Sequence, residues 1–430
     1  MATENDSIKN EAKAYFPWQI KIFIATWLAY AGYYFCRKAF YVVKSPLSAS
    51  LNISSIELAH LGTAYLIAYM IGQFSSAYIG KKLGPKLLLL IGMGISLTCN
   101  FAFGISNSFW TVMLFLTING LAQGTGWPGC IGSLAFWFKR KQRGTILGVW
   151  ATCYQLGSVI AGSFAAFMLG QAGWRWSFFG ASMVLLIIWA IVLFFHPNRP
   201  EDVNLCPLKD EDEENAEECS EKTEEKGLGW TRQVVITIIM MGMIYFCIKF
   251  LRYALWSWAP YFLNKNFNLA GEQAGYLSTV FDLFGFMGVL FAGYISDKVF
   301  KGKRAFVALA MLAFMTISFI VMYLFGSTSV LFFTISMGFA GFMLYGPDSL
   351  LSGVGAIDVG SKQGALAAAG IINGMGSIGP VFQEEIIGWM YKAYNQNLIP
   401  IFIMLVVVAG IGTFISFILW IKSRQGKANL

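Results

Sequence analysis

Charged side chains are scarce in this chain of 430 residues. Only 13% of the residues are Asp, Glu, Lys or Arg, whereas 57% are hydrophobic. Soluble domains carry about 25% charged residues, so the composition excludes an ordinary soluble globular protein. Histidine is rarer still, because His60 and His196 are the only two, and neither lies in a nucleophile–acid arrangement. We therefore expect neither an enzyme nor a cofactor.

Motifs for metals, disulfides and nucleotides are missing as well. The seven cysteines show no metal-ligand or Cys-x-x-Cys spacing. No G-x-x-x-x-G-K-[ST] sequence occurs, so nothing points to ATP hydrolysis. The basic clusters are short and each lies beside an apolar stretch, which argues against nucleic acid as a partner.

The chain instead contains many long apolar stretches. A helix needs about 20 apolar residues to cross a hydrocarbon layer of about 30 Å. Twelve such stretches can be counted, centred near Leu28, Tyr69, Gly94, Leu116, Tyr154, Leu186, Ile244, Phe286, Phe314, Gly338, Gly374 and Ala409. The sequence therefore predicts an all-α integral membrane protein with twelve transmembrane helices.

The basic residues predict the orientation of these helices. Most Lys and Arg residues lie at the two termini and at every second connection, which places both termini in the cytoplasm by the positive-inside rule. On the opposite side we expect Lys44, Arg175, Lys265 and Lys392. The favoured location is a bacterial inner (cell) membrane, with an endoplasmic-reticulum membrane as the alternative.

One long hydrophilic segment, residues 196–229, divides the helices six to six. It holds twelve of the 23 acidic residues and is predicted to be a cytoplasmic linker. Residues 1–195 and 230–430 resemble each other with a shift of about 216 residues, which places Gly72 on Gly288. Parallel repeats of this kind belong to transporters with a central site. We expect two pseudo-symmetric six-helix halves.

Four cations lie inside apolar stretches: Arg37 and Lys38 in GYYFCRKAF, and Lys249 and Arg252 in IKFLRYALWSWAP. Each buried charge costs about 2.5–3.5 kcal/mol on insertion scales. A lone cation could snorkel to the interface. Arg37 and Arg252, however, correspond in the repeat, since a proline follows each of them eight or nine residues later. We expect these two arginines to face each other across a central cavity.

Acidic partners for these cations are fewer. The candidates are Asp282, Asp348, Glu384 and Glu385. Asp282 could pair with Lys249, Lys38 or an arginine, which still leaves a positive surplus. A divalent oxyanion fits that surplus, and guanidinium groups hold phosphate through two parallel hydrogen bonds. Two opposed arginines therefore indicate a phosphate or a phosphate ester.

Polar and aromatic side chains supply further candidate contacts. Tyr30 and Tyr34 lie seven and three residues before Arg37 and share its helix face. Tyr154 and Tyr345 lie in helices interrupted by Gly or Pro, and Gln73 lies in the second helix. Each of these could instead be an interfacial or helix-packing residue.

Several motifs resemble a known family. GYISDK, from Gly293 through Asp297 to Lys298, resembles the cytoplasmic loop signature G-x-x-x-D-K/R of the major facilitator superfamily and predicts a gating loop. YYFCRKAFYVVKSPL, NGLAQGTGWPG, KFLRYALWSWAP and LYGPDSL together resemble the organophosphate:inorganic phosphate antiporter family, over essentially all twelve helices. RK-x-F-x-x-V-K-S-x-L leans toward its sugar-phosphate exchanger branch.

The resemblance implies exchange of a phosphorylated sugar for inorganic phosphate by alternating access. Arg37 and Arg252 match the family's phosphate-binding arginines, and Lys38 and Tyr34 match the neighbours of the first. Asp282 falls at an acidic position of the eighth helix. The expected partners are these small phosphates and the lipid bilayer, and the protein is expected to be a monomer.

Three positions depart from the bacterial glycerol-phosphate members of that family. Gln73 stands where a lysine is expected, Tyr154 where a histidine is, and Ser257 where an aspartate is. These departures favour a hexose phosphate such as glucose 6-phosphate over glycerol 3-phosphate. Two alternatives stay open: a sugar-phosphate sensor with a transporter fold, and a proton-coupled anion carrier in which Asp282 or Glu384 carries the proton.

Overall fold

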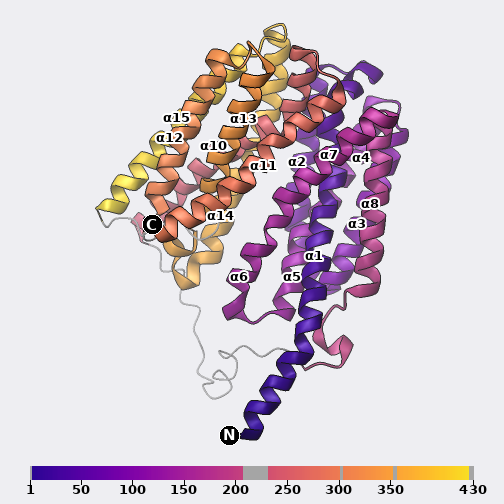
Figure 1. Ribbon diagram of the computed structural model, residues 1–430, viewed down its shortest axis with the longest axis vertical. Helices are drawn as coiled ribbons and strands as arrows, with labels where there is room; N and C mark the ends of the chain where they lie inside the picture. The colour runs from indigo at the N-terminus through magenta and orange to yellow at the C-terminus, as the bar shows by residue number, and fades with distance from the viewer. Residues whose placement is uncertain (1, 207–230, 301–303, 352–355, 426–430) are drawn as a thin grey trace. The chain divides into compact units, whose positions relative to one another are not determined.

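The computed structural model describes residues 2–206, 231–300, 304–351 and 356–425, and these residues form helices almost throughout (Figure 1). The predicted linker at residues 196–229 lies mostly outside these ranges and stays a prediction.

Before the linker the structure has a run of helices, two pairs of which are separated by very short breaks. The helices are α1 (Ala2–Leu51), α2 (Ser55–Leu83), α3 (Pro85–Ile105), α4 (Phe109–Gln123), α5 (Gly126–Trp137), α6 (Arg140–Trp150), α7 (Thr152–Ala172) and α8 (Trp174–Phe195). A short 3-10 turn, η1 (Pro200–Val203), follows. The breaks between α4 and α5 and between α6 and α7 are only one or two residues long.

The helices after the linker are α10 (Arg232–Phe267), α11 (Gly271–Tyr294), α12 (Arg304–Phe325), α13 (Val330–Ser349), α14 (Ala356–Ala393) and α15 (Ile399–Arg424). A π-helical turn, η2 (Ile295–Val299), extends α11. Each predicted apolar stretch is centred in a different helix, and eight spans among the described residues are long and apolar enough to cross a membrane. The all-α membrane fold is thus confirmed.

The chain forms two contact units, which we describe separately. The first contains residues 1–40 and 67–224, and within it α3 lies against α8 and α4. The second contains residues 41–66 and 225–430, and within it α10 packs against α14 and α15, while α11 packs against α13. The predicted halves at residues 1–195 and 230–430 stay a prediction.

A pair of glycines explains how closely helices approach in each unit. A Cβ atom on Gly72 of α2 would lie 2.3 Å from the main-chain oxygen of Leu121 on α4. A Cβ atom on Gly288 of α11 would lie 2.0 Å from the main-chain oxygen of Phe342 on α13. Only glycine fits at either place. Gly72 and Gly288, which the repeat places in register, therefore each allow a close contact between two helices.

The start of α3 is fixed by a hydrogen bond to the side chain of Asn198, which we call the Asn198 clasp. Gly84 adopts φ +78°, a left-handed conformation that favours glycine, and Pro85 opens the helix. The main-chain N–H of Lys86 donates a hydrogen bond of 3.1 Å to Oδ1 of Asn198, which follows α8. The side-chain amide of Asn198 thus caps α3 and ties the end of α8 to it.

Candidate functional site

Arg37 lies in the C-terminal half of α1 and is 6% exposed. Its Nε atom donates a hydrogen bond of 3.0 Å to Oε1 of Gln123, at the end of α4. The guanidinium carbon lies 4.9 Å from the ring centre of Tyr34 and 4.6 Å from that of Tyr69. Both rings offer their negative faces to the cation. We call Arg37, Tyr34, Tyr69 and Gln123 the Arg37 cluster.

The amide of Gln123 is oriented by its neighbours. Its Nε2 atom donates to Oδ1 of Asn119 at 3.2 Å and to Oγ of Ser96 at 3.4 Å. Ser96 in turn donates to the same Asn119 oxygen at 2.6 Å. Because two acceptors hold the amide nitrogen, the Gln123 oxygen is the atom that faces Arg37. This chain of buried amides fixes where the guanidinium lies.

Of the other predicted residues in the first unit, Tyr30 and Gln73 contact members of the Arg37 cluster. Tyr30 packs edge-on to Tyr34, with ring centres 6.0 Å apart, and also contacts two tryptophans. Gln73 donates to the hydroxyl of Tyr69 at 3.0 Å, so it contacts a ring that faces Arg37. Lys38 is fully buried on α1. Tyr154 is half-buried on α7.

Arg252 of α10 is held by a carboxylate in the second unit. Its Nη1 atom lies 3.1 Å from Oδ2 of Asp348 on α13. The guanidinium carbon also lies 4.6 Å from the ring centre of Tyr345, one helical turn before Asp348. The Tyr345 hydroxyl donates a 2.6 Å hydrogen bond to Oδ1 of Asp282 on α11. We call Arg252, Asp348, Tyr345 and Asp282 the Arg252 cluster.

Lys249 lies one turn before Arg252, so the two cations are neighbours on α10. Its Nζ atom donates to Oδ1 of Asn373 at 2.7 Å and to Oγ of Ser377 at 3.1 Å, both on α14. It also lies 4.8 Å from the ring centre of Tyr245. These partners are uncharged, so they orient the ammonium group without cancelling its charge.

The structure corrects the expectation for Lys44. It does not lie on a connection outside the membrane but inside α1, fully buried, with Nζ 3.0 Å from Oε2 of Glu384 on α14. Nζ also donates to Ser257 at 2.7 Å and lies 4.1 Å from the ring centre of Trp258. Glu384 accepts from Trp258 Nε1 at 2.7 Å and from the Ser257 hydroxyl. We call these four residues the Lys44–Glu384 network.

A sequence signal for Lys44 existed. It follows Arg37 by seven residues, which is two helical turns, so it shares the helix face of Arg37. Tyr69, Gln123 and Asn119 were also missed. The spacing of four between the two amides in NGLAQ is the pattern that could have revealed them.

The predicted gating loop falls at the end of α11. Gly293 lies in the last turn of α11, and Lys298 is exposed in the π-helical turn η2. The side chain of Asp297 lies outside the described part of the structure. A Cβ atom on Gly293 would meet nothing within 4 Å, so this position is not set by close packing.

Charge is the main chemical property of the two clusters. With Lys38 and Lys249 included, the clusters hold four cations and two carboxylates. These are Arg37, Lys38, Lys249 and Arg252, and Asp282 and Asp348. The formal charges of these described side chains sum to +2. The Lys44–Glu384 pair adds no net charge. Arrays of cations with aromatic and amide neighbours suit an oxyanion.

Comparisons with known proteins agree with this chemistry. Residues 23–382 match the sequence profile of the Major Facilitator Superfamily. The chain belongs to this superfamily. A probable hexose phosphate transport protein of Chlamydia pneumoniae is 27% identical over 97% of this chain and 94% of the relative. A putative glycerol-3-phosphate transporter 5 of Arabidopsis thaliana is 30% identical over 90% of this chain and 88% of the relative.

Solved structures support the fold of this superfamily member. A bacterial homologue of the human lysosomal transporter Spinster, in an inward-facing and unoccupied conformation, aligns with a TM-score of 0.74 at 14% identity. The alignment covers 96% of this chain and 98% of that chain. The resemblance to the organophosphate:inorganic phosphate antiporter family is confirmed by the sequence relatives. The protein is a multi-pass membrane transporter and not an enzyme.

Proposed function

We propose that this transporter exchanges a phosphorylated sugar, with glucose 6-phosphate or a similar hexose phosphate favoured, for inorganic phosphate. The observation that carries the proposal is the pair of buried arginines, Arg37 and Arg252, each against aromatic rings and each in a differently built cluster. The names of the two sequence relatives support phosphorylated metabolites as the substrate class. Glycerol 3-phosphate is the second choice because of Gln73, Tyr154 and Ser257.

The net charge of the clusters suits the substrate. A phosphate monoester carries about −1.5 to −2 charges at neutral pH, and the two clusters together carry +2. Binding thus brings a doubly charged anion to side chains whose formal charges sum to +2. Since moving uncompensated charge through an apolar layer is costly, the loaded transporter reorients more easily than the empty one. That difference makes the protein an exchanger.

The arginines have separate roles in this proposal. Arg37 is oriented by Gln123 and receives the phosphate as a preformed donor. Arg252 is held by Asp348, so the ligand has to compete with a carboxylate there. Lys38 and Lys249 add charge beside them. Tyr345 links Arg252 to Asp282 and orients both.

The test is counterflow of labelled phosphate in proteoliposomes. Vesicles with purified protein are preloaded with phosphate. The uptake of labelled phosphate is then measured in competition with a panel of sugar phosphates and with glycerol 3-phosphate. We expect Arg37→Lys and Arg252→Lys each to abolish exchange, because a lysine cannot make the two parallel bonds of a guanidinium. Exchange at the wild-type rate in either variant would overturn the proposal.

A matched control is available in the same chain. Arg175, at the start of α8, donates to the main-chain oxygens of Gly104 and Ser106 and to Asn107. It belongs to neither cluster, so Arg175→Lys should keep exchange per folded molecule. A protein that binds labelled sugar phosphate without exchanging phosphate would be a sensor. Uptake driven by a pH gradient without phosphate inside would indicate a proton-coupled carrier.

A further inference from the structure

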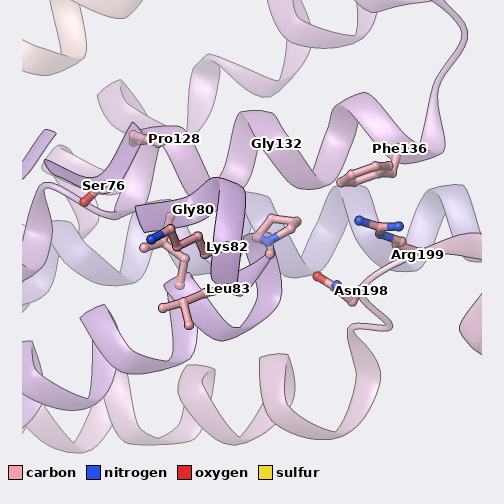
Figure 2. Close-up of a pocket in the computed structure, with 12 residues that line it drawn as sticks. Ser76, Gly80, Lys82, Leu83, Pro128, Gly132, Phe136, Asn198 and Arg199 are labelled. Atoms are coloured by element: carbon pink, nitrogen blue, oxygen red, sulfur yellow. The ribbon is translucent and has the colours of Figure 1, made fainter. Parts of the chain in front are cut away.

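A cavity of about 380 Å³ lies in the first unit, and none of its lining residues belongs to either arginine cluster. Its walls come from the end of α2, the start of α3, α5 and the segment after α8 (Figure 2). The volume falls within the range of about 300–1,000 Å³ that is typical of small-molecule sites. The clasp between Asn198 and the first turn of α3 forms part of its wall.

Two cations flank this cavity. Lys82 lies on one side and Arg199 on the other, with Asn198 beside Arg199 (Figure 2). Lys82 lies 5.3 Å from the ring centre of Tyr78, and Arg199 lies 5.1 Å from that of Phe136. No described carboxylate forms an ion pair with either cation. The aromatic rings therefore orient two cations that the described part of the chain leaves uncompensated.

The carboxylate of Asp202, close to Arg199 in the chain, is engaged with the main chain. Oδ2 of Asp202 accepts from the main-chain N–H groups of Asn198 and Arg199 at 2.8 and 3.1 Å. It shapes the turn and leaves the Arg199 side chain for the cavity. Ser76, which is 3% exposed, also lines the cavity. Two cations and a hydroxyl in the wall of one cavity together suit an anion with several acceptor oxygens.

Apolar side chains continue outward from the cavity. Tyr78 is 66% exposed, Leu83 37%, Leu87 45% and Phe136 38%. They lie near the ends of helices of a membrane protein, where aromatic and aliphatic side chains meet lipid. A ligand that fits both features has an anionic phosphate group and apolar chains.

We propose that the cavity binds the phosphate headgroup of an anionic phospholipid. Lys82 and Arg199 contact the phosphate from two sides, Ser76 and the Nδ2 atom of Asn198 donate to its oxygens, and the acyl chains lie against Tyr78 and Phe136. Basic pockets between transmembrane helices are suited to such headgroups. The inference does not depend on phosphate exchange, because the cavity shares no residue with the arginine clusters.

The test titrates purified full-length protein in detergent with phosphatidylglycerol or phosphatidylcholine and counts retained lipids by native mass spectrometry. A basic residue near an anionic lipid surface contributes about fivefold in affinity, so Lys82→Gln/Arg199→Gln should weaken phosphatidylglycerol binding about 25-fold. Phosphatidylcholine binding should not change. The matched control is Lys21→Gln/Lys139→Gln, which removes two exposed cations outside the cavity. It should bind like the wild type.

A second variant fills the cavity and keeps both cations. A Cβ atom on Gly132 of α5 would meet only Pro85, at 3.4 Å, so a side chain fits there and extends into the cavity. Gly132→Leu should also weaken phosphatidylglycerol binding, with an unchanged thermal midpoint. Wild-type binding in both this variant and the double variant would overturn the proposal, as would equal loss in the control.

Free phosphate is tested as the other source of the anion. Millimolar inorganic phosphate should leave phosphatidylglycerol bound to the wild-type protein. If phosphate released the lipid, and if the protein bound phosphatidylglycerol no better than phosphatidylcholine, the proposal that a lipid occupies the cavity would be overturned. Because all these readouts are binding measurements, their failure is distinguishable from a failure of phosphate exchange.

Discussion

Breaking the Lys44–Glu384 pair should destabilise the protein more than the loss of any exposed ion pair. Both side chains are fully buried, and Nζ lies 3.0 Å from Oε2. Coulomb attraction at this separation is about 5 kcal/mol for an effective dielectric constant of about 20. Removing one partner of a buried pair costs about 3–5 kcal/mol, because the other charge stays buried without compensation.

The perturbation is a double-mutant cycle with Lys44→Met and Glu384→Leu. We expect each single variant to lower the free energy of unfolding by about 3–5 kcal/mol. The double variant should lose only about 2 kcal/mol, since an apolar pair replaces the ions and only the hydrogen bonds from Ser257 and Trp258 are lost. The coupling energy, which is the sum of the two single losses minus the loss in the double variant, should therefore be at least about 4 kcal/mol.

The assay is the free energy of unfolding in detergent micelles, measured by steric trapping. Glu385→Gln is the matched control on the same helix, because Glu385 pairs with His60 where both side chains are 38–49% exposed. Exposed pairs are worth about 0–1 kcal/mol. Additive losses in the double variant, or single losses no larger than the control, would refute the reasoning.

Three further predictions concern packing, the Arg252 cluster and pH. Gly288→Ala should lower the free energy of unfolding by about 1–3 kcal/mol or more, because the methyl group would overlap a main-chain oxygen of α13. The control is Gly374→Ala, where a Cβ atom would meet nothing within 4 Å, and it should leave the free energy of unfolding unchanged in the same assay. Tyr345→Phe should slow phosphate counterflow, because Asp282 loses its 2.6 Å donor and the ring loses its anchor; an unchanged rate would contradict that positioning role. Burial lowers the pKa of His196 to about 4, so the folded state binds fewer protons than the unfolded state, whose pKa is about 6.5. Stability should be full above pH 6.5 and fall by about 3 kcal/mol toward pH 4, and thermal midpoints of His196→Gln should lack this slope.

Much of the fold follows from the sequence because the signal is local. An apolar stretch of about 20 residues specifies a transmembrane helix whatever surrounds it, and each predicted stretch became a helix. The repeat of the two halves stays a prediction, although Gly72 and Gly288, which it places in register, each lie at one close helix contact. The break between α4 and α5 was not predicted, because a short interruption leaves hydropathy unchanged, whereas the helix that contains Tyr154 was expected to be interrupted.

The site was only partly predictable, because its contacts join distant residues. Arg37 and Arg252 were found as charges in apolar sequence, which is a local anomaly. Lys44 was expected on the side opposite the termini, beyond the first helix, yet α1 continues to Leu51. Its partner Glu384 is 340 residues away, and no spacing rule reaches that far. Gln123 carries no charge and so gave no comparable signal.

The pairing of Arg252 with Asp348 bears on the proposed exchange, because it affects how readily a bound phosphate would leave. Two unopposed guanidiniums would bind a phosphate dianion tightly, and tight binding slows release. Asp348 lies 3.1 Å from Arg252, so a phosphate that approaches the guanidinium also approaches a like charge. The carboxylate lowers the cost of burying Arg252 when the site is empty and weakens the complex when it is full. The Nε atom of Arg37 donates to the neutral amide of Gln123, so Gln123 does not repel a phosphate that approaches Arg37. On the proposed mechanism, Arg37 captures the phosphate and Arg252 with Asp348 sets how easily it leaves.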